Sequence, residues 1–150
     1  MNDTQLYTQL LGIVAPWSVT DVELNIDSQE VQVRVEVLQR GMLFPCPECA
    51  KPCSMHDHRD ERRWRHLDSC GFSTFLVARV PRVKCDKHGV QTIEVPWSSP
   101  HSRFTRAFEA FTITVLQSTM VQSKAAALLR LSSSQIHEVM HRAVNRGLER

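Results

Sequence analysis

Two short turns of the chain carry residues that could bind one metal ion together. The first turn is Cys46-Pro-Glu-Cys49 and the second is Cys85-Asp-Lys-His88. Two residues separate the ligands in each turn, a spacing at which one tight turn can aim both donor atoms at the same ion. Gly89 follows the second turn and allows the backbone to reverse at low steric cost. We therefore predict one structural zinc ion bound by Cys46, Cys49, Cys85 and His88.

Other residues near the two turns could compete as ligands. They are Cys53, His56, His58, His66 and Cys70. A set of Cys46, Cys49, Cys53 and His56 is stereochemically feasible, so the sequence leaves it open whether Cys53 or His56 replaces a ligand of the second turn. We favour the two-turn set because only that set uses a second closely spaced ligand pair at a strand end. Cys53 and Cys70 are then expected to be small buried hydrophobic residues, and His56 and His58 to face solvent.

The segment before the first turn is predicted to form a helix and a β-hairpin. The helix covers Thr4–Val14, with Leu6, Leu10, Leu11 and Val14 on its buried side, and it stops before Pro16. Apolar residues then alternate with polar ones on both sides of a turn at residues 27–29, which predicts two strands with one buried face. The alternating residues are Val22, Leu24, Ile26, Val31, Val33, Val35 and Val37.

The segment between the two turns must contain structure of its own. It runs from Ala50 to Lys84, which is longer than the roughly 15 to 20 residues of a compact zinc motif. Phe72–Val80 reads as a strand, and residues 79–84 continue it as an edge that delivers Cys85. A further strand at Val90–Val95 leaves the second turn. Two strand–turn–strand units that share a metal describe a zinc ribbon, whose small core would depend on the ion.

The last third of the chain is predicted to be helical. Pro96–Pro100 is a break in composition that we interpret as a linker. Helical spacing of apolar residues follows over Thr105–Ser118 and over residues 121–130. Ser132 with Gln135 fits a capping box that starts a third helix, with Ile136, Val139, Met140 and Ala143 inward. The whole is an α+β fold with predicted domains at 1–42 (helix and hairpin), 43–98 (zinc ribbon) and 103–150 (helix-turn-helix).

The third helix could read DNA in the major groove. Its polar side can donate hydrogen bonds to base edges or phosphates. We predict DNA contacts by Lys124 of the second helix and by Ser133, Ser134, His137, His141, Arg142 and Asn145. A plain three-helix bundle would show a similar apolar pattern, and Arg130 stands where such turns often carry glycine. The sequence pattern alone therefore leaves an inert bundle open.

An arginine-rich stretch surrounds Trp64. Arg62, Arg63 and Arg65 are predicted to face DNA phosphates, because guanidinium groups make bidentate contacts with phosphate. The alternative is an exposed strand or loop in which interleaved acids weaken the local field. Trp64 itself is expected to lie in the ribbon's core.

Charge and cysteine usage narrow the class of protein. Residues 1–40 carry a net charge of −4, whereas residues 41–104 and 105–150 each carry +3. This asymmetry points to a polyanionic partner for the later two-thirds of the chain. Five cysteines are an odd number for a disulfide framework, and neither a signal peptide nor a transmembrane-length apolar run is visible. We expect a cytoplasmic protein with reduced thiols, no membrane partner and no small-molecule substrate.

Several ordered motifs resemble one family of proteins. They are Cys46-Pro-Glu-Cys49, Trp64-Arg-His-Leu-Asp68, Val80-Pro-Arg-Val-Lys-Cys85, His88-Gly-Val90, Val95-Pro-Trp97, Ser102-Arg-Phe-Thr105 and the closing helix-turn-helix. Together they look like the N-terminal region of insertion-sequence transposases of the ISL-three family. The resemblance implies that this region binds zinc and recognises the terminal inverted repeats of a mobile element. It further implies that an RNase H-like domain with an Asp-Asp-Glu triad follows, and that Cys46, Cys49, Cys85 and His88 match the zinc positions.

The chain departs from that family in one respect. After Arg106 its acids are Glu109, Glu138 and Glu149, all in helical segments, so no acidic triad can form there. We expect a truncated or split transposase that binds double-stranded DNA without strand-transfer chemistry, and hence no enzyme. An interaction or homodimerisation module that regulates an intact transposase is the alternative. An enzyme with catalytic zinc ranks last, because four protein ligands leave no position for water.

Overall fold

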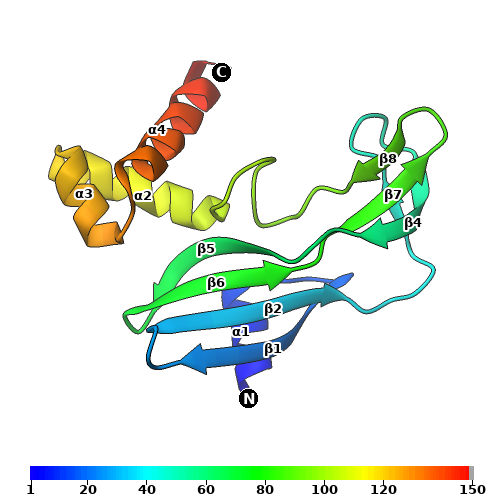
Figure 1. The fold of residues 1–150 in the computed structure, drawn as a ribbon, viewed down its shortest axis with the longest axis horizontal. Helices are drawn as coiled ribbons and strands as arrows, with labels where there is room; N and C mark the ends of the chain where they lie inside the picture. The colour runs from blue at the N-terminus through cyan, green and yellow to red at the C-terminus, as the bar shows by residue number, and fades with distance from the viewer. Residues whose placement is uncertain (149–150) are drawn as a thin grey trace.

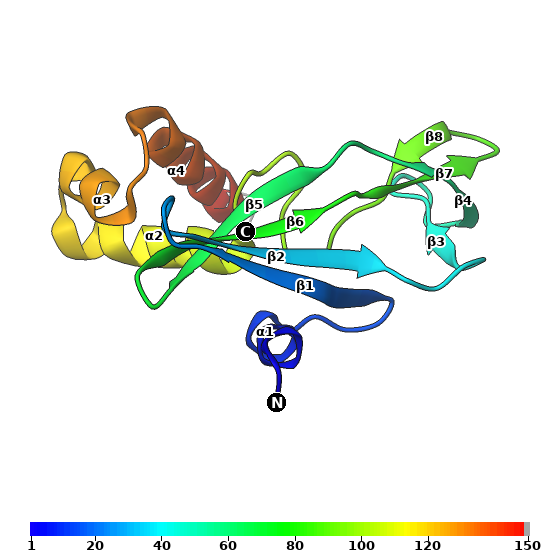
Figure 2. The same cartoon turned by 60° about the horizontal axis from the view of Figure 1, so that its bottom comes forward.

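In the computed structural model, which describes residues 1–148, two four-stranded sheets and four helices form an elongated mixed α+β molecule (Figure 1). The larger sheet lies in the middle, the smaller sheet at one end and three helices at the other. Figure 2 shows the remaining helix, α1, against the face of the larger sheet near β1. Among these residues, no helix combines the length and the apolar character needed to cross a membrane.

The larger sheet contains the predicted hairpin and two strands from the predicted ribbon segment. Its strand order is β1-β2-β6-β5, with β1 and β2 antiparallel and β2 and β6 parallel. The bounds are β1 (Trp17–Asn25), β2 (Glu30–Val37), β5 (Arg62–Ser69) and β6 (Phe72–Ala78). Val33 and Val35 are fully buried, as the alternation predicts. Leu24 and Ile26 are exposed instead: Leu24 lies near the end of the edge strand β1, opposite Val31, and Ile26 follows that strand in the turn.

Helix α1 (Asp3–Leu11) buries a different face from the one predicted. A capping box between Asn2 and Gln5 starts it, and Gly12 ends it with a left-handed φ of 62°. Tyr7 and Leu11 pack against the core, whereas Leu6, Leu10 and Val14 are exposed.

The smaller sheet has the strand order β3-β4-β7-β8. Its strands are β3 (Leu43–Pro45), β4 (Pro52–His58), β7 (Pro81–Cys85) and β8 (Gly89–Thr92). The pairing of β4 with β7 continues as the pairing of β5 with β6, so residues 52–85 form one long antiparallel hairpin that runs through both sheets. The segments 1–42 and 43–98 therefore share a sheet, which the sequence pattern did not indicate.

Three tryptophans join the parts of the core. Trp97 lies edge-on to Trp17 at 4.9 Å and to Trp64 at 5.4 Å between ring centroids. Trp64 is buried, as predicted. The interpretation of 96–100 as a linker is wrong in one respect: Trp97 and Ser98 are buried, and the Arg106 N–H donates to the Trp97 carbonyl at 2.9 Å. The segment is packed against the sheet because its tryptophan fills the core.

The C-terminal helices are α2 (Arg106–Thr119), α3 (Gln122–Leu129) and α4 (Ser133–Leu148). Two backbone hydrogen bonds fix the start of α2 to the edge of β5. The Arg65 N–H donates to the Arg103 carbonyl at 2.9 Å, and the Thr105 N–H donates to the Arg65 carbonyl at 3.0 Å. The predicted capping box of Ser132 and Gln135 is present at the start of α4. The three helices are therefore attached to the sheet by strand-like pairing as well as by side chains.

His66 gives this attachment a pH dependence. Its Nδ1 lies 2.8 Å from the Thr105 hydroxyl, and burial lowers the pKa of His66. A depressed folded-state pKa stabilises the fold above the unfolded value of roughly 6.5, and this contribution is lost as the pH falls through the folded-state pKa. We expect the unfolding free energy, measured with urea, to fall more steeply below about pH 6.5 in the wild type than in His66→Gln. Parallel pH curves for the two proteins would contradict this role of His66.

Candidate metal centre and nucleic-acid interface

The four predicted metal ligands converge at the end of the smaller sheet. Cys46 follows β3, Cys85 is the last residue of β7, and His88 precedes β8. The Cys46 N–H donates to the Lys51 carbonyl at 2.9 Å, and the Ala50 N–H donates to the Cys46 carbonyl at 2.8 Å. These bonds fold the first turn tightly. The second turn ends at Gly89, whose φ of 69° is the left-handed conformation that its position predicts.

The distances within this cluster fit a tetrahedral zinc shell. All four donor atoms lie within 4.8 Å of one another. His88 Nδ1 is 3.6 Å from Cys46 Sγ and 3.6 Å from Cys85 Sγ, and the Sγ atoms of Cys49 and Cys85 are 3.7 Å apart. Zinc bond lengths of about 2.3 Å to sulfur and about 2.0 to 2.1 Å to nitrogen give tetrahedral edges of about 3.6 to 3.8 Å. The side chains thus already have the separations that the ion requires.

The competing ligands lie outside this cluster. Across residues 1–148, no other group of three or more His, Cys, Asp or Glu side chains has donor atoms this close. Cys53 is buried, as expected, and its thiol donates to the Lys51 carbonyl at 3.2 Å. His56 is exposed on β4. Cys70 was expected to be buried but is exposed, because it lies in the turn between β5 and β6.

The surroundings of the cluster favour a charged thiolate at Cys85. Backbone N–H groups of His88 and Lys87 lower the pKa of Cys85 to about 6. Glu48 Oε2 lies 3.3 Å from His88 Nε2. A carboxylate at this nitrogen orients the imidazole so that Nδ1 faces the sulfurs, which is the usual arrangement behind a metal-bound histidine.

Replacing one ligand tests the cluster. We expect Cys85→Ser to abolish stoichiometric zinc binding, measured by a chromogenic chelator, and to unfold the smaller sheet, because metal-binding energy is folding energy in such sites. Cys70→Ser is the matched control, since Cys70 is exposed and distant in sequence from both turns. A Cys85→Ser protein that keeps one equivalent of zinc, or that folds normally without zinc, would contradict the assignment.

The structure leaves most of the predicted DNA contacts of α3 and α4 exposed. Lys124 on α3 is exposed, and so are five residues of α4: Ser133, Ser134, His137, His141 and Asn145. Ile136 and Val139 face inward, as predicted. The exposed residues 133, 137, 141 and 145 recur at every fourth position and therefore form one stripe along the helix. We name these six exposed side chains the α4 surface.

The turn between α3 and α4 keeps the geometry that glycine usually provides. Arg130 occupies it in the left-handed conformation, with φ 56° and ψ 46°. Its guanidinium forms an ion pair with Asp68 of β5. Asp68 also accepts a hydrogen bond from Arg65 at 2.9 Å. This attachment to the sheet offsets the cost of a left-handed non-glycine residue.

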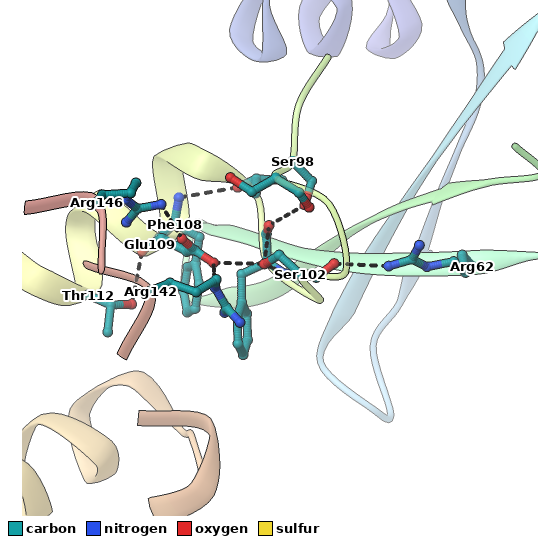
Figure 3. A network of polar contacts seen from close by, with 11 residues as sticks. Arg62, Ser98, Ser102, Phe108, Glu109, Thr112, Arg142 and Arg146 are labelled. Carbon is teal, nitrogen blue, oxygen red and sulfur yellow. Dashed lines mark hydrogen bonds and ion pairs between the residues drawn. The ribbon is translucent and has the colours of Figure 1, made fainter. Parts of the chain in front are cut away.

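Arg142 does not belong to the α4 surface. Its Nε donates to Glu109 Oε1 at 2.7 Å, and Arg146 Nη1 donates to Glu109 Oε2 at 3.1 Å (Figure 3). Glu109 on α2 is 1% exposed and also accepts a hydrogen bond from the Ser102 hydroxyl at 2.7 Å. Arg142 therefore faces α2, because the buried carboxylate attracts it, and we correct its predicted role as a DNA contact.

The three arginines of β5 have different environments. Arg65 is buried, and its guanidinium donates to Asp68 and to the Leu129 carbonyl at 3.2 Å, so its predicted contact with phosphate is also corrected. Its role is to join β5 to the end of α3. Arg62 and Arg63 are exposed, as their prediction requires. Arg62 lies 4.6 Å from the Trp64 ring, and Arg63 lies 3.6 Å from the Phe75 ring.

Removing the charge of Glu109 tests how α4 is held. We expect Glu109→Gln to lower the unfolding free energy by about 2 to 3 kcal/mol, because two guanidinium groups lose their buried counter-charge while parts of both still reach solvent. Urea denaturation followed by circular dichroism measures this. Glu138→Gln, an exposed acid on α4, is the control and should change stability by less than about 0.5 kcal/mol. Equal effects of the two substitutions would show that the Glu109 ion pairs do not hold the helix.

Family profiles of known proteins match two parts of the chain, the segment with the metal ligands and the helical segment. Residues 43–88 match the family profile described as the zinc-finger of transposase IS204/IS1001/IS1096/IS1165. Residues 93–144 match the profile described as the helix-turn-helix domain of transposase family ISL3. No solved structure shows a significant match to the chain.

Curated relatives cover almost the whole chain. The transposases for insertion sequence element IS1557 of Mycobacterium tuberculosis strains CDC 1551 / Oshkosh and ATCC 25618 / H37Rv are each 29% identical to it over 146 residues. The match covers 95% of this chain and 33% of each relative, so the chain spans about a third of their length. The two profiles and these relatives agree with the motifs quoted above. Residues 43–88 and 93–144 therefore carry the zinc-ribbon and helix-turn-helix domains of ISL3-family transposases.

Proposed function

We propose that the chain is a zinc-stabilised module that binds the terminal inverted repeats of a mobile element as part of a transposase. The observation that carries this proposal is the exposed polar α4 surface on the second helix of a helix-turn-helix. A helix in this position enters the major groove in proteins of this kind. The match to the helix-turn-helix profile supports the same conclusion.

The chemistry of the α4 surface suits both phosphates and bases. Ser133 and Ser134 lie in the first turn of α4, where free backbone N–H groups and the helix dipole favour a phosphate. Lys124 of α3 supplies a charge for the same backbone. His137, His141 and Asn145 follow along the helix and can hydrogen-bond to base edges. We propose that these three residues provide sequence specificity.

The metal centre supports this surface and takes no part in chemistry. Four protein ligands complete a tetrahedral shell, so we propose one structural zinc ion at Cys46, Cys49, Cys85 and His88. We further propose that this region performs no strand transfer. Glu109 is held between two arginines, and Glu138 is exposed on α4, so neither is placed to share a divalent metal.

A second candidate function is homodimerisation or regulation of an intact transposase. An apolar groove between α2 and α4 favours it, lined by Ile113, Leu116, Met140, Ala143 and Val144. This groove borders the exposed polar stripe, since Val144 lies three residues after His141 and seven residues after His137 on the same helix. Light scattering that shows a tight dimer with the α4 surface buried would favour this function over DNA binding.

DNA binding can be tested with the zinc-loaded chain. In a gel-shift assay at moderate salt, we expect tighter binding to a duplex that carries the inverted repeats flanking the gene than to a scrambled duplex. Each of His137→Ala and Asn145→Ala should weaken the specific complex by about 10- to 100-fold, since one base contact contributes about 1 to 3 kcal/mol. Ser118→Ala, at an exposed position of α2, is the control. A zinc-loaded protein that forms no complex with either duplex would refute the proposal.

A further inference from the structure

A strip of arginines runs along the open edge of β5 towards the start of α4. One hollow at this edge is lined by Arg59, Glu61, Arg62, Arg63, His101 and Arg103. A second hollow is lined by Arg63, Arg65, Phe75, Arg103, Phe104, Arg130, Leu131 and Gln135. The two hollows share Arg63 and Arg103, so they form one continuous surface that ends in the first turn of α4. We define the arginine strip as Arg59, Arg62, Arg63, Arg103 and Arg130.

Much of the positive charge in this strip has no acidic partner. Within residues 1–148, Arg59, Arg62 and Arg103 form no ion pair with a carboxylate. The acid of the first hollow, Glu61, is engaged by Arg34 at 2.6 Å. Burial lowers the pKa of Arg62, and repulsion from Arg59 and Arg103 adds to the effect. Like charges held together without counter-charges form a site for an anion.

The strip is held rigidly against the helices. Arg62 donates to the Ser102 carbonyl at 3.0 Å and lies over Trp64. Ser102 is buried and its hydroxyl donates to Glu109, which in turn holds α4 (Figure 3). The backbone hydrogen bonds between Arg65 and residues 103–105 also attach β5 to the start of α2. The strip and the α4 surface are therefore presented to a partner as one body.

We propose that the arginine strip binds the phosphates of the same DNA duplex whose major groove receives α4. This inference rests on the proposed function and extends it to a second contact region. Contacts to phosphate carry no sequence information, so the strip adds affinity and salt dependence while α4 selects the sequence.

The double variant Arg59→Gln/Arg103→Gln tests this proposal. The hydrogen bonds recorded for these two residues use their backbone atoms, so the substitutions leave the fold intact. Binding of the full zinc-loaded chain to a duplex of about 30 base pairs is measured by fluorescence anisotropy over a range of salt concentrations. We expect the slope of log affinity against log salt to fall by about 1.8, since each phosphate contact contributes about 0.9. The affinity should fall by the same factor for specific and scrambled duplexes.

A charge-matched control separates the strip from a general loss of charge. Arg40→Gln/Lys84→Gln removes two exposed charges from outside the strip and should leave the slope nearly unchanged. If the wild type binds specifically and the slope is unchanged in Arg59→Gln/Arg103→Gln, the proposal that the arginine strip binds phosphates is refuted. The proposed function is then unaffected. Equal wild-type affinity for both duplexes, with the expected loss of slope, would support the strip and refute sequence-specific binding. An absence of any complex would refute both.

Discussion

Closure of the Cys46, Cys49, Cys85 and His88 shell is the constraint on which the rest of the structure depends. The shell ties together the two chain segments at the open end of the long hairpin formed by residues 52–85. The open end of that hairpin, β4 and β7, belongs to the smaller sheet. The turn end, β5 and β6, belongs to the larger sheet, where β6 pairs with β2. The smaller sheet has few buried residues of its own, so a zinc ion held by these four residues would supply stability that its core cannot. A small metal site thereby positions strands well beyond its own ligands.

The second level of organisation is the junction of β5 with the helices, where buried charges add to the apolar contacts of Phe104, Phe108 and Val139. Arg65 connects β5 to the end of α3, and Glu109 connects α2 to α4 through two arginines. Buried ion pairs contribute little net stability, but they fix one geometry, because any other packing leaves a charge without a partner. We interpret them as the reason that α4 has a defined orientation relative to the sheet. That orientation is what a DNA-binding surface needs.

The sequence revealed the features whose signals are local and missed those that arise from distant contacts. The ligand spacing, the hairpin and the capping box of Ser132 and Gln135 are all local patterns, and the structure contains each of them. The parallel pairing of β2 with β6 joins residues that lie 43 positions apart in the chain and has no local signature. Arg65 and Arg142 were assigned to DNA because residue type alone does not show whether a guanidinium has a buried acceptor. Only the fold shows that the Arg65 guanidinium donates to Asp68 and that the Arg142 guanidinium donates to Glu109.

The central claim is that a structural metal site supports one rigid surface that binds duplex DNA. Chemical-shift mapping of the zinc-loaded, ¹⁵N-labelled chain during titration with duplex DNA tests it most directly. We expect changes at the exposed α4 residues Ser133, Ser134, His137, His141 and Asn145 and along β5, with the amides of the two ligand turns and of α1 unaffected. Changes centred on the ligand turns, or confined to the apolar groove between α2 and α4, would contradict it.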